Sequence, residues 1–480
     1  MIKNNDPASK VWRKVAGVLP FYLFTLLPLN AQAPWSLRQC IDYAVSHNIE
    51  IQQRDNLRQQ QQYHLSTARN SRLPDLNASA SESFSFGRAQ TLDGTYSNRN
   101  TNNTSFSLGT SVPLFTGFQI PNTVKLSQLN LEAATADLEK AKNDVSMRVA
   151  QAYVQILYDM EIADVARRQI AIDSQQVARL TAFVQNGKAS QAELSQQQAT
   201  LAQARLTATQ ADNNLQLSVL ALTQLLELPT PDGFTIRRPA VAAVPVGSPS
   251  GSASVPSALV SSASVPSASA SALSSDASVL SPDAIYAEAL AVKPEVQAEQ
   301  LRLSASERSI DIAKAALYPK LNLNAGLQTN YYKTNGIQAE GFMDQMKNNF
   351  AQYVGLSLSV PIFNRFATRN SVRSAQVDRD NQQLALDNVK KTLYKEIQQV
   401  YYNARAAQAK YQSSEAATVS ARDAFTLMQA KYENGKATST EFNESKNNYL
   451  KSESDLEQAR YEYLYQTALL DFYRGRELDF

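Results

Sequence analysis

Two similar turns, far apart in the chain, constrain the fold more than any other feature of the sequence. Residues 183–194 read FVQNGKASQAEL, and residues 431–442, at an offset of 248, read KYENGKATSTEF. The same offset relates further pairs: Val112 and Val360, Pro113 and Pro361, Phe115 and Phe363, Tyr153 and Tyr401. Upstream the offset becomes 245, as for Pro74 and Pro319. Repetition over so long a span predicts a chain that folds as two similar halves.

Two unrelated segments frame these halves. Basic residues precede an apolar stretch that ends near Leu29, and small residues follow it, which predicts an export signal over residues 1–31. Residues 240–281 are mainly Ala, Ser, Val and Pro with almost no charge, which is typical of a flexible linker. The first repeat is therefore expected at 32–239 and the second at 282–480.

Composition argues against several classes of protein. Removal of residues 1–31 leaves a nearly neutral chain, so nucleic acid is not an expected partner. Cys40 is the only cysteine, which excludes an intrachain disulfide, and we expect it to be buried on the first helix. His47 and His64 are the only histidines, and no phosphate loop, nucleophile elbow or metal-spaced cluster is present. We therefore expect no enzymatic activity, no cofactor and no metal.

Four segments alternate between apolar and small polar residues, which predicts β-strands. In the clearest of them Phe106 and Leu108 alternate with Ser105 and Ser107. The four strands are expected at about 76–88, 104–115, 321–331 and 353–363. Polar stretches that begin at Ser97 and Tyr332 are expected to be solvent loops.

This alternation has two explanations. It suits a membrane barrel, where outward residues meet lipid and inward residues meet water, and equally a sheet half-buried in a soluble protein. Four strands cannot close a barrel, and an open sheet edge is not tolerated in hydrocarbon. If the strands lie in a membrane, several copies of the chain must share one barrel.

Helical periodicity begins after each second strand and continues to the repeated turn. In the first half it covers about 121–184, roughly 96 Å at 1.5 Å per residue. The apolar stripe keeps three-four spacing: Leu138, Ala141, Val145, Val149, Ala152, Ile156, Met160, Ala163, Ala166 and Ile170. Another stripe begins at Met147, which indicates helical neighbours on two sides.

The repeated turn itself predicts a helical hairpin. Gly187 and Gly435 suit the left-handed conformation that ends a helix. Capping-box spacing then starts a returning helix in each half, through Ser190 with Glu193 and through Thr438 with Glu441. The hairpin tips are expected at 186–190 and 434–438, about 100 Å from the strands.

With these features in place, the sequence resembles the TolC-like outer-membrane efflux proteins. The resemblance rests on the order and duplication of weak motifs: SLRQCIDYAVSHN at the start, RLPDL and YPKL before the first strands, SVPLF and SVPIF after the second strands, and both glycine tips. It implies an α+β membrane protein in which each protomer has two repeats, each with two strands and a long helical hairpin. Three protomers would form a twelve-strand β-barrel continuous with a twelve-helix α-barrel.

The resemblance also implies a function and partners. It implies a homotrimer in the outer membrane of a Gram-negative bacterium, in contact with outer-membrane lipid and extending into the periplasm. It would act as a passive exit duct, supplied by a periplasmic membrane-fusion adaptor and an inner-membrane transporter of the RND or ABC type. Small-molecule efflux is the expected task, and a type I protein-secretion channel is the alternative. A rival from another class is a secreted trimeric coiled-coil adhesion protein, which would lack matched strand pairs.

Site residues follow from the same resemblance. Acidic residues on the last helix line the periplasmic mouth in the family, and the matching positions are Glu441 and Glu444. Glu441 also has a purely structural explanation as a capping residue, whereas the repeat partner of Glu444 is the neutral Gln196. The candidates for a latch on the mouth are Tyr432, Lys436 and Glu193, with Lys436 in place of the expected basic residue because Ala437 occupies that position. Adaptor contacts are expected at the tips: Asn186, Gly187, Lys188, Ser190, Asn434, Gly435, Lys436 and Thr438.

Overall fold

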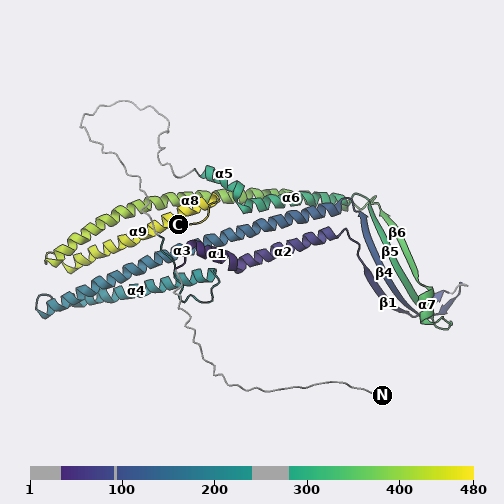
Figure 1. Cartoon of the computed structure of the whole chain (residues 1–480), viewed down its shortest axis with the longest axis horizontal. Helices are drawn as coiled ribbons and strands as arrows, with labels where there is room; N and C mark the ends of the chain where they lie inside the picture. The colour runs from purple at the N-terminus through teal and green to yellow at the C-terminus, as the bar shows by residue number, and fades with distance from the viewer. Residues whose placement is uncertain (1–33, 91–93, 240–280, 480) are drawn as a thin grey trace, which may run out of the picture.

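The computed structural model describes residues 34–90, 94–239 and 281–479. The expected export signal at 1–31 lies outside the described residues, as does the expected linker at 240–281 except for Ser281. The described chain is elongated, with a small sheet at one end and helical hairpins that reach away from it (Figure 1). The two hairpin tips lie at the end of the molecule opposite the sheet.

The elements of the two halves follow one plan. The first half contains α1 (Leu37–His47), α2 (Ile49–Asn70), β1 (Asn77–Ser85), β2 (Arg88–Gln90), β3 (Tyr96–Asn98), β4 (Thr101–Phe115), α3 (Gln119–Gln185) and α4 (Gln191–Leu225). The second contains α5 (Pro282–Val292), α6 (Pro294–Ala315), β5 (Lys320–Thr334), α7 (Phe342–Asn348), β6 (Ala351–Ser359), α8 (Ala367–Glu433) and α9 (Ser439–Tyr473). Both long helices have 67 residues and both returning helices have 35, so the duplication extends to element length.

Local sequence explains where the helices begin and end. Ser36 and Gln39 form a complete capping box at the start of α1, and Ser281 followed by Pro282 starts α5. The long helix α3 spans about 100 Å at 1.5 Å per residue. Most of its expected apolar stripe is buried, including Val145, Val149 and Ile156. Cys40 is fully buried on α1, as the sequence predicted.

One antiparallel sheet joins the two repeats. Its strand order is β1-β4-β5-β6, so the central pair β4–β5 brings a strand from each half together. Side chains alternate between an apolar face and a polar face. The register places apolar residues opposite apolar residues on neighbouring strands, and polar residues opposite polar ones. The apolar face carries Ala78, Ala80, Phe106, Leu108, Val112, Leu321, Leu323, Leu327, Val354, Leu356 and Leu358, whereas serine pairs such as Ser79 with Ser107 lie on the other.

The strand ends differ from those expected. β6 ends at Ser359 rather than near 363, since Pro361 lacks the N–H that a ladder requires. The polar stretches expected to be loops are partly strands, because β3 contains Ser97 and β5 continues through Tyr332 to Thr334. Polar side chains therefore did not prevent pairing at the distal end of the sheet.

The short helix α7 was not expected from the sequence. It covers the edge of β5 that β6 leaves free beyond Gln328. The Gln345 side chain accepts from the Tyr332 N–H at 2.9 Å and donates to the Tyr332 carbonyl at 3.1 Å, and Asn349 donates to the Asn330 carbonyl at 2.7 Å. These amides replace a missing strand and satisfy an otherwise open edge.

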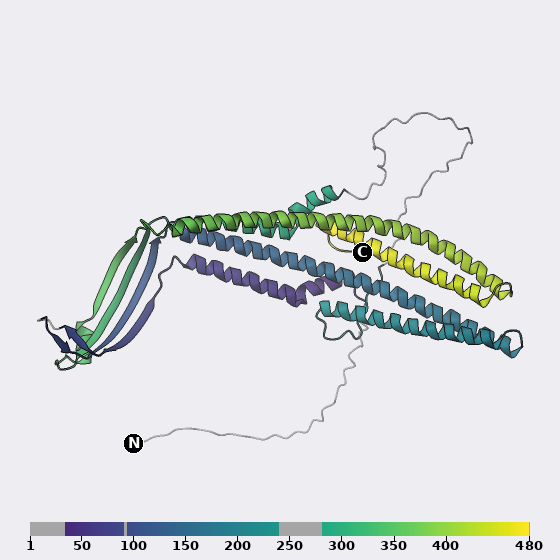
Figure 2. The ribbon, with the colours of Figure 1, turned by 180° about the vertical axis from the view of Figure 1, so that it is seen from behind.

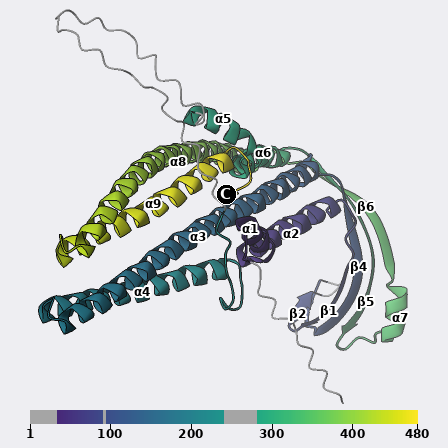
Figure 3. The same ribbon diagram turned by 60° about the vertical axis from the view of Figure 1, so that its left-hand side comes forward.

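The helices continue the order of the strands. α2 packs on α3, α3 on α6, and α6 on α8, so that the helices that adjoin the sheet form one layer (Figure 2). Farther along, the hairpin α3–α4 and the hairpin α8–α9 lie next to each other through contacts of α3 with α9 (Figure 3). The edge elements α2 and α8, like β1 and β6, each have a partner on one side only within the described chain.

Candidate functional site at the hairpin tips

The two tips have the same backbone geometry. Gly187 and Gly435 adopt φ of 67° and 70°, the left-handed region that favours glycine. The Lys188 N–H donates to the Phe183 carbonyl, and the Lys436 N–H donates to the Lys431 carbonyl, both at 2.8 Å. These bonds satisfy the last carbonyls of the long helices, and the chain can reverse within a few residues.

The first turns of the returning helices differ in one detail. The Glu193 N–H donates to Ser190 Oγ at 3.2 Å, which caps α4. At the second tip the box is reciprocal, because the Glu441 carboxylate also accepts from the Thr438 N–H at 2.7 Å and from its hydroxyl at 2.8 Å. These Thr438 donors lower the pKa of Glu441 below its usual value. The structural role that the sequence predicted for Glu441 is therefore present.

Glu444 lies one turn beyond this cap and is exposed on α9. Its repeat partner Gln196 is exposed at the corresponding position of α4. Glu193 and Lys436 are also exposed. Among the described residues, neither the Glu193 side chain nor the Lys436 side chain forms a hydrogen bond with Tyr432.

Tyr432 packs between the two hairpins. Its ring stacks on Phe442 with a centroid distance of 4.8 Å, and the Arg179 guanidinium lies 5.3 Å from the rings of both Tyr432 and Phe183. Arg179 also donates to the Glu433 carbonyl at 3.0 Å, at the end of α8. Burial raises the pKa of Tyr432. Arg179 was not predicted from the sequence as a site residue, and it connects α3 to the tip of the other hairpin.

A buried ion pair joins the two hairpins slightly farther from the tips. Asp173 on α3 and Lys446 on α9 form a salt bridge in which both side chains are 0% exposed. Gln197 on α4 donates to Asp173 at 3.2 Å, and Asn443 donates to Gln197 at 3.0 Å. A polar cluster in a helical core holds one geometry, since each member loses its partner if the helices slide.

This pair was not predicted from the sequence, although a signal was present. Asp173 follows Ala163, Ala166 and Ile170 at three-four spacing, so it occupies a core position of α3. A carboxylate at such a position requires a buried partner. Its partner lies 273 residues away, and no local pattern identifies it.

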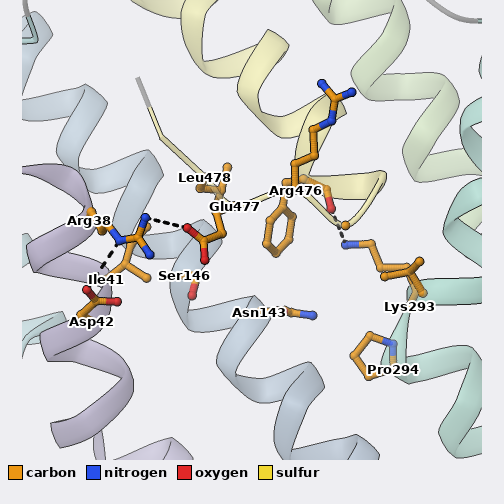
Figure 4. Close-up of a pocket in the computed structure, with 13 residues that line it drawn as sticks. Arg38, Ile41, Asp42, Asn143, Ser146, Lys293, Pro294, Arg476, Glu477 and Leu478 are labelled. Carbon is orange, nitrogen blue, oxygen red and sulfur yellow. Dashed lines mark hydrogen bonds and ion pairs between the residues drawn. The ribbon is translucent and has the colours of Figure 1, made fainter.

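A cavity of about 300 Å³ lies far from the tips, between α1, α3, the turn from α5 to α6 and the C-terminal segment. Two charged side chains of its lining have partners: Arg38 pairs with Glu477 at 2.7 Å (Figure 4), and Lys293 donates to the Phe472 carbonyl at 3.3 Å. Asn48, the repeat counterpart of Lys293, similarly donates to the Leu225 carbonyl at 3.1 Å. The cavity groups therefore tie the short helices to the ends of the returning helices.

Two features are absent from residues 34–90, 94–239 and 281–479. No group of three or more His, Cys, Asp or Glu side chains that could hold a metal ion occurs among them. None of the helices in these ranges combines the length and the apolar character needed to cross a membrane.

Comparison with known proteins decides the family. The family model described as outer membrane efflux protein matches residues 40–227 and 285–476, one match for each repeat. The chain belongs to the outer membrane efflux protein family. Membership argues against the rival interpretation, in which the chain is a secreted coiled-coil adhesion protein. It agrees with the resemblance seen in the sequence.

Relatives of this efflux family protein are distant. It is 25% identical to the fusaric acid resistance protein FusA of Burkholderia cepacia over 303 residues, which are 62% of this chain and 49% of FusA. It is 26% identical to protein CyaE of Bordetella pertussis over 121 residues, or 25% of this chain and 24% of CyaE. The chain thus spans half or less of the length of these relatives.

Solved structures share the fold over nearly the whole chain. The CmeC outer membrane channel of Campylobacter jejuni gives a TM-score of 0.71 at 17% identity, and covers 92% of this chain and 87% of its own. The outer membrane protein VceC of Vibrio cholerae gives 0.69 at 19% identity, with 92% and 96% covered. Membership of the family places the protein in the outer membrane.

Proposed function

We propose that this protein is the outer-membrane exit duct of an efflux system and that three copies form the duct. The observation that carries the proposal is that both edge strands of the sheet lack a partner on their outer side within the described chain. β1 and β6 are the edge strands and are exposed along their whole length. In an outer membrane such edges must be paired, and pairing β6 of one copy with β1 of the next closes a barrel of twelve strands.

The helices support the same arrangement. Within the chain α3 packs against α6, so the second long helix α8 should pack against α2 of the next copy. Leu384 on α8 is 65% exposed, whereas its repeat counterpart on α3, Ala136, is 9% exposed. An exposed leucine at a position that is buried in the other repeat indicates a missing neighbour. A next copy supplies that neighbour.

The repeat also distinguishes two kinds of junction at the periplasmic mouth. Within a protomer, α3 and α9 are joined by Asp173 and Lys446. The counterparts of these residues are Ala421 on α8 and Gln198 on α4, which would meet between protomers. Charged junctions within protomers would thus alternate with neutral junctions between them. We expect the mouth to open between protomers, while the two hairpins of each protomer move together.

Arg179 extends this contrast to the tip. Its counterpart on α8 is Leu427, which is 66% exposed in the single chain. The contact of Arg179 with Tyr432 therefore has no charged equivalent between protomers. Tyr432 keeps its proposed place in the latch through this contact, and Lys436 and Glu193 remain candidates for contacts with other chains.

The proposed duct would have an acidic mouth and external partners. Three copies of Glu444, with Glu441 beside them, would form a ring that attracts cations. A periplasmic adaptor would contact the tips at 186–190 and 434–438, and an RND or ABC transporter would supply the energy. The similarity to FusA, a protein named for fusaric acid resistance, supports small molecules as cargo. In this duct no residue performs chemistry.

Conductance in planar bilayers tests the function and the acid ring together. We expect purified wild type to form cation-preferring channels, and Glu444→Gln to move the cation-to-anion permeability ratio towards one. Glu441→Gln should change it less, because the Glu441 carboxylate is already bound by the Thr438 N–H and hydroxyl and is less available to passing cations. Glu132→Gln, which removes an exposed acid on α3 far from the tips, is the matched control.

Each possible failure has its own meaning. Absence of channels from a folded, membrane-inserted protein would contradict the exit duct. Channels whose selectivity is the same in wild type and Glu444→Gln would leave the duct in place and exclude the acid ring.

A further inference from the structure

The strand-to-helix elbows of the two repeats differ at one equivalent position. In the first elbow Gly117 and Phe118 adopt φ of 64° and 66°. In the second elbow Arg365 and Phe366 adopt φ of 55° and 62°. The backbone path is the same, yet the second repeat has an arginine where the first has glycine. Left-handed φ is unusual for a residue with a side chain, and such outliers persist where surrounding structure or function requires them.

In the first repeat the neighbouring element explains the glycine. A Cβ on Gly117 would lie 2.5 Å from the Ala315 carbonyl oxygen and 2.7 Å from the Tyr318 Cβ. The first elbow is therefore in tight contact with the C-terminal end of α6. Ala315 is 1% exposed because of this packing, and Gly117 is buried as well.

At Arg365 the equivalent neighbour is absent from the single chain. The repeat counterparts of Ala315 and Tyr318 are Asn70 and Leu73, at the end of α2. The two turns match, because the Leu73 N–H donates to the Asn70 carbonyl as the Tyr318 N–H donates to the Ala315 carbonyl. In the single chain Asn70 is exposed and Leu73 is 62% exposed. This helix end lies at the opposite edge of the chain from Arg365.

We propose that Arg365 is an intersubunit residue whose guanidinium binds the C-terminal carbonyls of α2 in the neighbouring copy. The inference rests on the proposed trimer, in which β6 beside the next β1 brings that helix end to the second elbow. At Gly117 the contact with α6 is too close for a Cβ. Because Arg365 has a Cβ, the equivalent junction between copies is wider than the junction within one copy. The Thr67, Ala68 and Asn70 carbonyls each accept one hydrogen bond within their own chain and keep a second lone pair. A cation near the last carbonyls of a helix is stabilising, and arginine can span the wider gap.

The partner surface offers acceptors beside cations of its own, since Arg69 lies in the last turn of α2 and Arg72 follows that helix. Asn70 adds an amide oxygen to the carbonyls at the end of α2. The nearby Arg72 lines a cavity with Phe115 and Phe118 of its own chain's elbow. The proposed contact would join neighbouring protomers where barrel and helical tube meet.

Replacement of Arg365 by glycine separates backbone strain from subunit contact. Glycine adopts left-handed φ freely, so Arg365→Gly should leave each protomer at least as well folded. The proposal predicts that the trimer nevertheless dissociates at a temperature lower by about 2 to 4 °C. Arg369→Ala, at the third residue of α8 and also exposed, is the control expected to leave dissociation unchanged. A trimer of Arg365→Gly as stable as wild type would overturn the proposal.

Cross-linking tests the geometry directly. Arg365→Cys with Asn70→Cys, in a Cys40→Ala background and treated with a short bismaleimide, should give covalent dimers and trimers. Arg365→Cys with Gln59→Cys, in the middle of α2, should not. Absence of the Arg365–Asn70 product in trimers that still conduct ions would overturn the inference and leave the exit duct intact. Absence of trimers and channels in wild type would instead contradict the proposed function.

Discussion

Lys446→Met is expected to loosen the junction between the two hairpins of each protomer, which adds an opening within protomers to the opening between them and so raises channel conductance. The substitution leaves Asp173 buried without its cationic partner, because both side chains are fully buried in the native structure. Removal of one member of a buried pair typically costs about 3 to 5 kcal/mol. Amide hydrogen exchange around residues 173–180 and 440–450 should accelerate, and single-channel recordings should show larger or longer openings.

A double variant provides the matched control. Asp173→Asn with Lys446→Met removes both charges and leaves an amide oxygen as acceptor for Gln197, and removal of both charges of a buried pair is often neutral for stability. It should therefore return exchange rates close to those of wild type. Slow exchange and unchanged conductance in Lys446→Met alone would show that the ion pair does not hold the hairpins together.

Gly117→Ala is expected to have the second largest effect, because it introduces a Cβ at the first elbow. The new atom would lie 2.5 Å from the Ala315 carbonyl oxygen, on a residue with φ of 64°. Overpacking and left-handed strain together should cost about 3 kcal/mol. We expect a lower yield of folded protein and a lower unfolding temperature by circular dichroism.

Gly187→Ala separates the two causes of this loss. Gly187 has a similar φ of 67°, but a Cβ there would meet nothing within 4 Å. The tip variant should lose only the cost of left-handed strain, about 1 kcal/mol. Equal losses in Gly117→Ala and Gly187→Ala would mean that the contact with α6 is unimportant.

The order and type of the main elements could be predicted from the sequence because their signals are local. Glycine with a capping residue three positions later marks each tip, and alternation marks each strand pair, wherever these residues lie in space. The long helix α3 was expected at about 121–184 and is observed at Gln119–Gln185. The duplication reinforced each assignment, because every main element was seen twice.

Elements that depend on a distant partner could not be predicted in this way. The helix α7 is held by Gln345 and Asn349, whose amides replace a strand along β5. Tyr432 was expected in a latch, but only the fold reveals Arg179 as its contact. Polar side chains in such places resemble solvent-exposed ones in the sequence, since burial is a property of the packed chain.

The sequence by itself determined that this chain is a duplicated unit with two strand pairs and two helical hairpins, since glycine, proline and capping residues act within a few residues of themselves. Only the tertiary structure decided which neighbour each charged residue meets. It paired Asp173 with Lys446 inside the protomer and left Arg365 exposed at the edge. The physical reason is that repeats with the same backbone acquire different neighbours, and a side chain's energy depends on what it packs against.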